Sequence, residues 1–162
     1  MHISRVEPGK IEIKTKQTVV SIDKQVRIGA LDINVPGEYD AEEVAVVGIA
    51  VDGQTVYSLS IEDVQVCSLP QGITNLPQNV TEQIGSVDVL LLPIQEGASS
   101  ADLLPVINQV EPTMVIPYGS GDINQFAASS GAGADHLPHI KVTRSLLNPE
   151  ERQTILLSVT KG

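Results

Sequence analysis

Two stretches decide the fold: Ser86-Val-Asp-Val-Leu-Leu-Leu-Pro-Ile94 and Glu111-Pro-Thr-Met-Val-Ile-Pro-Tyr118. A continuous apolar run of this length, ended by proline, is typical of a strand buried on both faces. Catalytic groups are often mounted where such strands end, yet Gln95–Gly97 and Tyr118–Ser120 bring no histidine or cysteine there. The sequence therefore predicts a buried sheet whose usual site for chemistry has been altered.

A helix is predicted between these two strands. Ser99–Val110 has apolar residues at helical spacing, and we expect Ala101, Leu104, Ile107 and Val110 to face inward. Two shorter helices are predicted at Pro77–Ile84 and from the capping residue Asp122 to Ser129, and further strands at Ile140–Thr143 and Gln153–Val159.

The first half of the chain predicts antiparallel strands. Its strand-like segments share alternating or clustered β-branched residues, and they are Lys10–Thr15, Thr18–Ile22, a weak segment Asp23–Asn34, Val44–Val51, Thr55–Ile61 and Val64–Leu69. Tight turns are predicted at Lys16-Gln17, Asp52-Gly53 and Glu62-Asp63, and another at Val35–Tyr39.

Composition limits the partners. The chain has 162 residues and 41% hydrophobic content, which predicts a single domain over residues 1–162. A net charge of −10 disfavours nucleic acid and anionic membrane surfaces as partners. The first residues lack the apolar stretch of a signal peptide, and a single cysteine, Cys67, suits a reducing compartment, so we expect a cytoplasmic protein.

One order of motifs along the chain points to a family. Pro36-Gly-Glu-Tyr39 precedes the three-strand meander, which is followed by Val87–Ile94 and Gln109–Pro117. This order resembles the metallo-β-lactamase fold, specifically its small branch of predicted metal-dependent hydrolases related to sugar-phosphate lactonases. The resemblance covers nearly the whole chain. It implies an α+β protein, a truncated αββα sandwich of mixed sheets flanked by helices.

The resemblance also implies roles for single residues. Pro36, Gly37, Glu38 and Tyr39 would form a structural turn at the rim of the former active site, with Gly37 in a conformation costly for residues that carry a Cβ.

The family's metal ligands are missing at the positions that the resemblance assigns to them. The family binds two metals through a His-x-His-x-Asp-His loop after a strand that ends in Ile-Asp, here Ile22-Asp23, but no histidine occurs between His2 and His136. Later ligands would follow two further strands, where Pro70–Gly72 and Tyr118–Ser120 stand instead. Zinc sites need three or more converging donors, so we expect a degenerate member with no metal, no other cofactor and no catalytic residue.

Other candidate sites are weaker. Asp135, His136 and His139 offer one carboxylate and two imidazoles for a displaced metal site, although Pro138 interrupts a helix that would align them. Cys67 lies in an apolar strand, where a buried inert thiol is the favoured interpretation.

Two further motifs have alternative interpretations. Gly119-Ser-Gly-Asp122 can offer backbone N–H groups to an anion, but Asp122 as a helix N-cap accounts for the same residues. An acidic cluster can hold a hard cation weakly or form a solvated rim, and its members are Glu38, Asp40, Glu42 and Glu43.

These observations leave three hypotheses of function. The leading one is a non-catalytic, self-associating scaffold or interaction module, expected to form a homodimer or larger assembly because the strands Val44–Val51 and Val87–Leu92 need cover. The second is a metal-dependent hydrolase with the displaced site at Asp135, His136 and His139. The third is a pseudoenzyme subunit that regulates an active paralogue.

Overall fold

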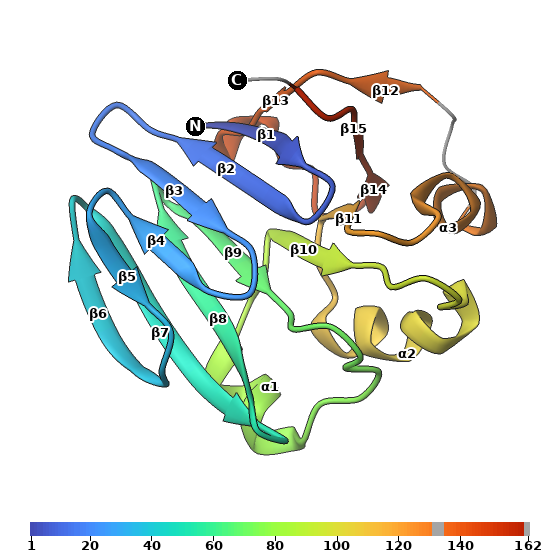
Figure 1. The fold of residues 1–162 in the computed structure, drawn as a ribbon, viewed down its shortest axis with the longest axis horizontal. Helices are drawn as coiled ribbons and strands as arrows, with labels where there is room; N and C mark the ends of the chain where they lie inside the picture. Colours follow the sequence, from blue (N-terminus) through green and yellow to red (C-terminus); the bar gives the residue numbers. More distant parts are fainter. Residues whose placement is uncertain (131–134, 161–162) are drawn as a thin grey trace.

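The computed structural model describes residues 1–130 and 135–160, which form two large sheets, a small two-stranded sheet and three α-helices (Figure 1). The first sheet is antiparallel throughout. Its strands, in spatial order, are β13 (Ile140–Lys141), β1 (His2–Glu7), β2 (Lys10–Lys14), β3 (Val19–Ile22), β4 (Val26–Ile28) and β5 (Leu31–Ile33).

The second sheet is mixed. The strands β6 to β9 are antiparallel neighbours, whereas β9, β10, β11 and β14 pair in parallel. Its spatial order is β14 (Gln153–Thr154), β11 (Met114–Tyr118), β10 (Val89–Pro93), β9 (Val64–Ser68), β8 (Gln54–Ile61), β7 (Val44–Val51) and β6 (Gly37–Ala41). Two short strands, β12 (His136–Leu137) and β15 (Leu156–Leu157), pair with each other.

The layers follow from which face of each sheet is apolar. One core cluster lies between the sheets and joins side chains such as Ile13, Leu59 and Leu91. The other joins the outer face of the second sheet to helices α1 (Gln78–Ile84), α2 (Ser100–Val110) and α3 (Ile123–Ser129). The expected α+β class and two-sheet sandwich are therefore confirmed, with all three described helices packed on the second sheet (Figure 1).

No described helix covers the outer face of the first sheet, and its composition explains why. Strand register aligns Ser4, Glu12, Ser21, Arg27 and Asp32 across this face. An antiparallel sheet with one polar face can leave that face in water. The helix layer of the αββα pattern is thus seen on one side only within the described chain.

The predicted inward face of α2 is confirmed for Ile107 and Val110 and wrong for Ala101 and Leu104. Leu104 is 51% exposed and Ala101 is also exposed, whereas Leu103, Val106, Ile107 and Val110 are buried. The buried set follows spacing i, i+3, i+4, i+7, which matches 3.6 residues per turn. A constant spacing of three, as in the predicted set, drifts around the helix and leaves the apolar face.

The predicted turn at Val35–Tyr39 ends earlier than expected. Gly37 already begins the edge strand β6, which pairs with β7, so only the residues before it form the turn. The Tyr39 hydroxyl donates to the Val35 carbonyl at 2.8 Å and holds the turn closed. Gly37 has φ +149°, and a Cβ there would lie 3.3 Å from the Tyr39 hydroxyl, so the expected constraint on Gly37 is confirmed.

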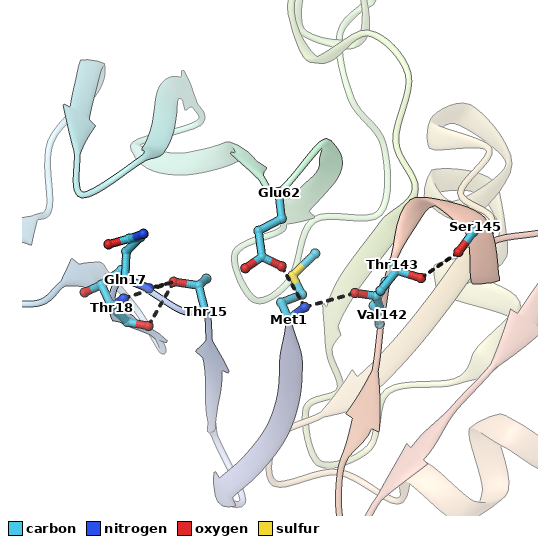
Figure 2. A network of polar contacts seen from close by, with 8 residues as sticks. All are labelled: Met1, Thr15, Gln17, Thr18, Glu62, Val142, Thr143 and Ser145. Carbon is cyan, nitrogen blue, oxygen red and sulfur yellow. Dashed lines mark hydrogen bonds and ion pairs between the residues drawn. The ribbon is translucent and has the colours of Figure 1, made fainter.

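Other turns match the sequence. The Thr15 hydroxyl accepts from the backbone N–H groups of Gln17 and Thr18, which shapes the turn between β2 and β3 (Figure 2). Asp52 and Gly53 both have positive φ, as the tight turn between β7 and β8 requires. None of the described helices is both long enough and apolar enough to cross a membrane.

An ion pair ties β1 to the second sheet. The Met1 ammonium donates to the Glu62 carboxylate at 2.8 Å and to the Val142 carbonyl at 3.1 Å (Figure 2). The hydrogen bond from this ammonium is the main reason that the pKa of Glu62 lies below its ordinary value of 4.5. The contact joins the first strand of one sheet to the turn between β8 and β9 of the other.

We predict that Glu62→Gln makes the free energy of unfolding depend less steeply on pH in the acid range. Because the folded-state pKa of Glu62 is lowered, its contribution is present above pH 4.5 and is lost as the pH falls below that value. The measurement is urea unfolding from about pH 6 to about pH 3, where acid unfolding by carboxylates occurs. Glu96→Gln, on an exposed loop, is the control. An equal acid dependence in wild type and Glu62→Gln would contradict the prediction.

Candidate functional site

A cleft of about 800 Å³ opens between the two sheets. Its walls come from segments far apart in the chain, at the ends of β3, β9, β10 and β11 and at the turn between β7 and β8. Parallel strands carry their carboxyl ends to one edge, so β9, β10 and β11 deliver Ser68, Pro93 and Tyr118 to the same place. Ligand sites are common at such strand ends.

The floor of the cleft is made of hydroxyl side chains. Alternation along the strands turns Tyr57, Ser68 and Tyr118 toward the space between the sheets, and each is 3% exposed. The Tyr57 hydroxyl donates to the Ile33 carbonyl at 3.2 Å, which links the floor to the first sheet. These residues form a polar base at the end of an apolar core.

Burial raises the pKa of the phenols on the floor, which are already neutral near pH 7 at their ordinary value of 10. It raises the pKa of Tyr118 to about 12, with the Ser68 hydroxyl opposing the shift and the nearby Asp23 carboxylate adding to it. Burial likewise raises the pKa of Tyr57.

The rim of the cleft carries the charges. Asp23 and Lys24 follow β3 and are exposed. On the opposite side, the Gln54 amide donates to the Gln71 carbonyl at 3.1 Å and connects the turn after β7 to the segment after β9. The rim thus offers one carboxylate, one ammonium and several amides.

Arg5 supports the cleft from behind. Arg5 is only 8% exposed. Its guanidinium donates to the carbonyls of Pro8, Leu157 and Gly119 at 3.1, 3.3 and 3.0 Å. Burial lowers the pKa of Arg5. The sequence analysis missed this residue, although it occupies an inward position of β1, two residues after Ile3, where a charge is unusual.

The cleft brings together the positions at which metal ligands are expected from the resemblance. Asp23, Pro70 and Tyr118 all line it. A family model for the Beta-lactamase superfamily domain matches residues 7–119, which includes each of these positions. The chain belongs to the β-lactamase superfamily.

A solved structure of similar fold covers nearly the whole chain. It is a crystal structure from Thermotoga maritima of a proposed zinc-dependent hydrolase of the metallo-β-lactamase superfamily, with a TM-score of 0.78 and 17% identity over 97% of this chain and 98% of that one. Another, a variant of CmlA beta-hydroxylase, has a TM-score of 0.40 and 13% identity over 51% of this chain and 24% of that one. No curated protein matches the chain.

The donor set of the cleft does not fit the zinc chemistry of this fold. Asp23 is the sole histidine, cysteine, aspartate or glutamate among the residues that line the cleft. Across residues 1–130 and 135–160, no three such residues are grouped to hold a metal ion. Zinc in proteins takes at least three such ligands, so one carboxylate is insufficient.

The displaced metal site proposed from Asp135, His136 and His139 is not assembled in the described chain. His136 Nε2 lies 2.6 Å from the Asn124 side-chain oxygen, whereas the His139 ring packs edge-on against His2 with centroids 5.6 Å apart. Paired strands explain the separation, because β12 joins β15 while β13 joins β1.

The remaining candidates have structural roles. Cys67 is fully buried, and burial raises the pKa of its thiol to about 12, which confirms the inert interpretation. The Asp122 carboxylate accepts from the Gln125 N–H at 3.0 Å, which confirms the N-cap.

The turn and the acidic cluster lie outside the cleft. Pro36, Gly37, Glu38 and Tyr39 do not line it, because β6 pairs along the sheet edge and carries them away, and Asn34 takes the rim position instead. Asp40, Glu42 and Glu43 line a separate hollow of about 580 Å³, which they share with Lys16.

Proposed function

We propose that this superfamily member is non-catalytic and acts as a self-associating interaction or scaffold module. The observation that carries the proposal is the donor set of the cleft, which holds a single metal-ligating side chain, Asp23, among the described residues. In place of further ligands stand Ser68, Tyr118 and the Pro70–Gln71 segment, which cannot hold a zinc-activated water.

We predict that the purified protein contains less than stoichiometric zinc and hydrolyses no lactone, lactam or phosphodiester. The measurement is elemental analysis of protein dialysed first against zinc and then against metal-free buffer, followed by assays with and without added zinc. About one retained zinc per chain, or zinc-dependent turnover, would contradict the absence of a catalytic metal site.

The surface that supports self-association differs from the one expected. All five residues of β10 are buried inside the chain, so this strand needs no partner. Exposed apolar side chains instead occur near the edge strands β5 and β6, where Val35 is 56% exposed and Val47 is 37% exposed. Edge strands present unpaired backbone groups, and exposed apolar residues beside them favour association with another chain.

We predict a homodimer or larger closed assembly at micromolar concentration. Light scattering gives the mass, and Val47→Lys should shift it toward the monomer because a charge would be buried at the contact. Leu146→Lys is the matched control, since Leu146 is 63% exposed in the 3-10 turn Arg144–Leu146. A monomeric mass at all concentrations, or equal effects of both variants, would contradict the proposed contact.

A further inference from the structure

A row of basic side chains crosses the outer face of the first sheet, which no described helix covers. Strand register places Lys141 opposite His2 and His2 opposite Lys14, and all three side chains are exposed. The His139 ring packs edge-on against His2, with ring centroids 5.6 Å apart. We call these four residues the basic row. The row stands out in a chain that has twenty acidic residues against ten lysines and arginines.

Folding alone does not account for the basic row. Like charges placed directly opposite each other on a sheet lower its stability. Among the described residues, no ion pair joins Lys14, Lys141 or either histidine to a carboxylate. Glu12 is the carboxylate of the next rung on this face, and it forms no ion pair with Lys14. The described chain therefore leaves these basic groups to water or to an outside partner of opposite charge.

A concave surface of opposite charge lies on the same molecule. The hollow of about 580 Å³ has a single basic residue, Lys16, among its described lining residues, together with five carboxylates, those of Asp40, Glu42, Glu43, Glu62 and Asp63. Two of the five have partners within the chain, because Glu62 accepts from the Met1 ammonium and Glu42 from the Thr18 hydroxyl. We call this surface the acidic hollow. Its other carboxylates make no ion pair within the described chain.

The basic row and the acidic hollow adjoin each other. Lys14 directly precedes Thr15, which lines the hollow, and His2 directly follows Met1, whose ammonium bonds the Glu62 carboxylate (Figure 2). When two adjoining surfaces are complementary, a two-fold axis between them places each one on its counterpart in a second copy. Long lysine side chains that stand on a flat sheet face are also suited to entering a concave surface.

We propose that two copies of this chain associate through a two-fold contact in which the basic row of each lies against the acidic hollow of the other. The proposal rests on the proposed self-association and adds a charged contact to it, since Val35 and Val47 belong to neither surface. A net charge of −10 opposes a nucleic acid or an anionic membrane as the partner. Repulsion between the net charges of two copies is screened beyond about 8 Å at physiological ionic strength, so the local pairing decides the contact.

Reversal of charges on each surface tests this contact. The row variant carries Lys14→Glu and Lys141→Glu, and the hollow variant carries Asp40→Lys and Glu43→Lys. All four side chains are exposed, so both variants should keep wild-type thermal stability. Each variant alone should associate at least about tenfold more weakly than wild type in analytical ultracentrifugation, because like charges then face each other.

Mixing the two variants should restore the contact. In a mixed pair, the reversed row faces the reversed hollow, and the unchanged row faces the unchanged hollow. We therefore expect a pair that contains one chain of each variant, detected by native mass spectrometry with one chain isotope-labelled. The control replaces the hollow variant with Glu82→Lys/Glu96→Lys, which has the same net charge but carries its reversals on α1 and on the loop after β10. This control should form no mixed pair with the row variant.

Three results would overturn the charged contact. They are unchanged association of the row variant or the hollow variant, failure of these two variants to combine, and equal pairing in the control mixture. If Val47→Lys still weakened association in any of these cases, self-association through the apolar side chains would stand without the charged contact. A wild-type protein that stays monomeric at all concentrations would overturn both.

Discussion

Gly119→Ala should lower the free energy of unfolding by about 3 kcal/mol or more, the sum of a strained backbone and an overpacked contact. Gly119 has φ +113°, and a Cβ there would lie 2.7 Å from the Ile94 carbonyl oxygen. That oxygen belongs to backbone and also accepts from Gly121 N–H at 2.8 Å, so it cannot move aside without breaking a hydrogen bond.

The contact matters because it joins two loops of the cleft. Ile94 follows β10 and Gly119 follows β11, and the Ile94 N–H donates to the Tyr118 carbonyl at 2.7 Å. Gly119 itself donates to the Pro8 carbonyl and accepts from Arg5. A methyl group at this point would separate strand ends that several hydrogen bonds hold together.

Gly53→Ala is the matched control for backbone strain. Gly53 has φ +76°, but a Cβ there would meet no atom within 4 Å. Gly53→Ala should lower the free energy of unfolding by about 1 kcal/mol, the cost of positive φ alone. Thermal unfolding of both variants checks the comparison, since 1 kcal/mol corresponds to roughly 2–4 °C in a chain of this size. If both variants lost similar amounts of stability, the Ile94 backbone would have to move to accommodate the added methyl group at little energetic cost.

The sequence predicted those strands whose signals are local, although it missed β1 and β6. The buried runs around Leu90 and Val115 and the turns at Asp52-Gly53 and Glu62-Asp63 depend on neighbouring residues, and all of them occur in the structure. The weak signal of Asp23–Asn34 became two strands, β4 and β5, because inward Val26, Ile28 and Ile33 complete the inter-sheet core. That outcome depends on packing with distant segments.

The cleft could be predicted in part. The resemblance marked Asp23, Pro70 and Tyr118 as positions of interest, and the structure places all three on one cleft. The floor hydroxyls could not be assigned, since the exposure and hydrogen bonding of Ser68 depend on strands paired across the sheet. Arg5 was missed because its three acceptors lie up to 152 residues away in the chain.

Arg5→Met should destabilise the protein by about 2–4 kcal/mol. The guanidinium donates to three carbonyls, and methionine would fill much of the space while removing the donor of the buried Leu157 and Gly119 bonds; the Pro8 carbonyl would still accept from the Gly119 N–H. Removing a buried charge recovers some desolvation energy, but buried carbonyls left unpaired cost about 1–3 kcal/mol each, so the net effect is a loss.

Arg5→Lys separates charge from geometry. Lysine keeps the positive charge but has no planar fork, so it cannot reach the carbonyls of Pro8, Leu157 and Gly119 in the same directions. We expect Arg5→Lys to lose most of the stability lost by Arg5→Met. If Arg5→Lys had wild-type stability, the positive charge alone would account for the role of Arg5. The three hydrogen bonds of the guanidinium would then not be needed.

Arg27→Met is the surface control for this series, measured by urea unfolding. Arg27 is exposed and pairs with Asp32 at 3.5 Å, and exposed pairs of this kind contribute about 0–1 kcal/mol. If Arg5→Met lowered the free energy of unfolding much more than Arg27→Met, the buried contacts of Arg5 in β1 would be shown to stabilise the loop after β11. Because Gly119 accepts from Arg5 and lines the cleft, loss of the guanidinium should also broaden the NMR signals of residues 118–121.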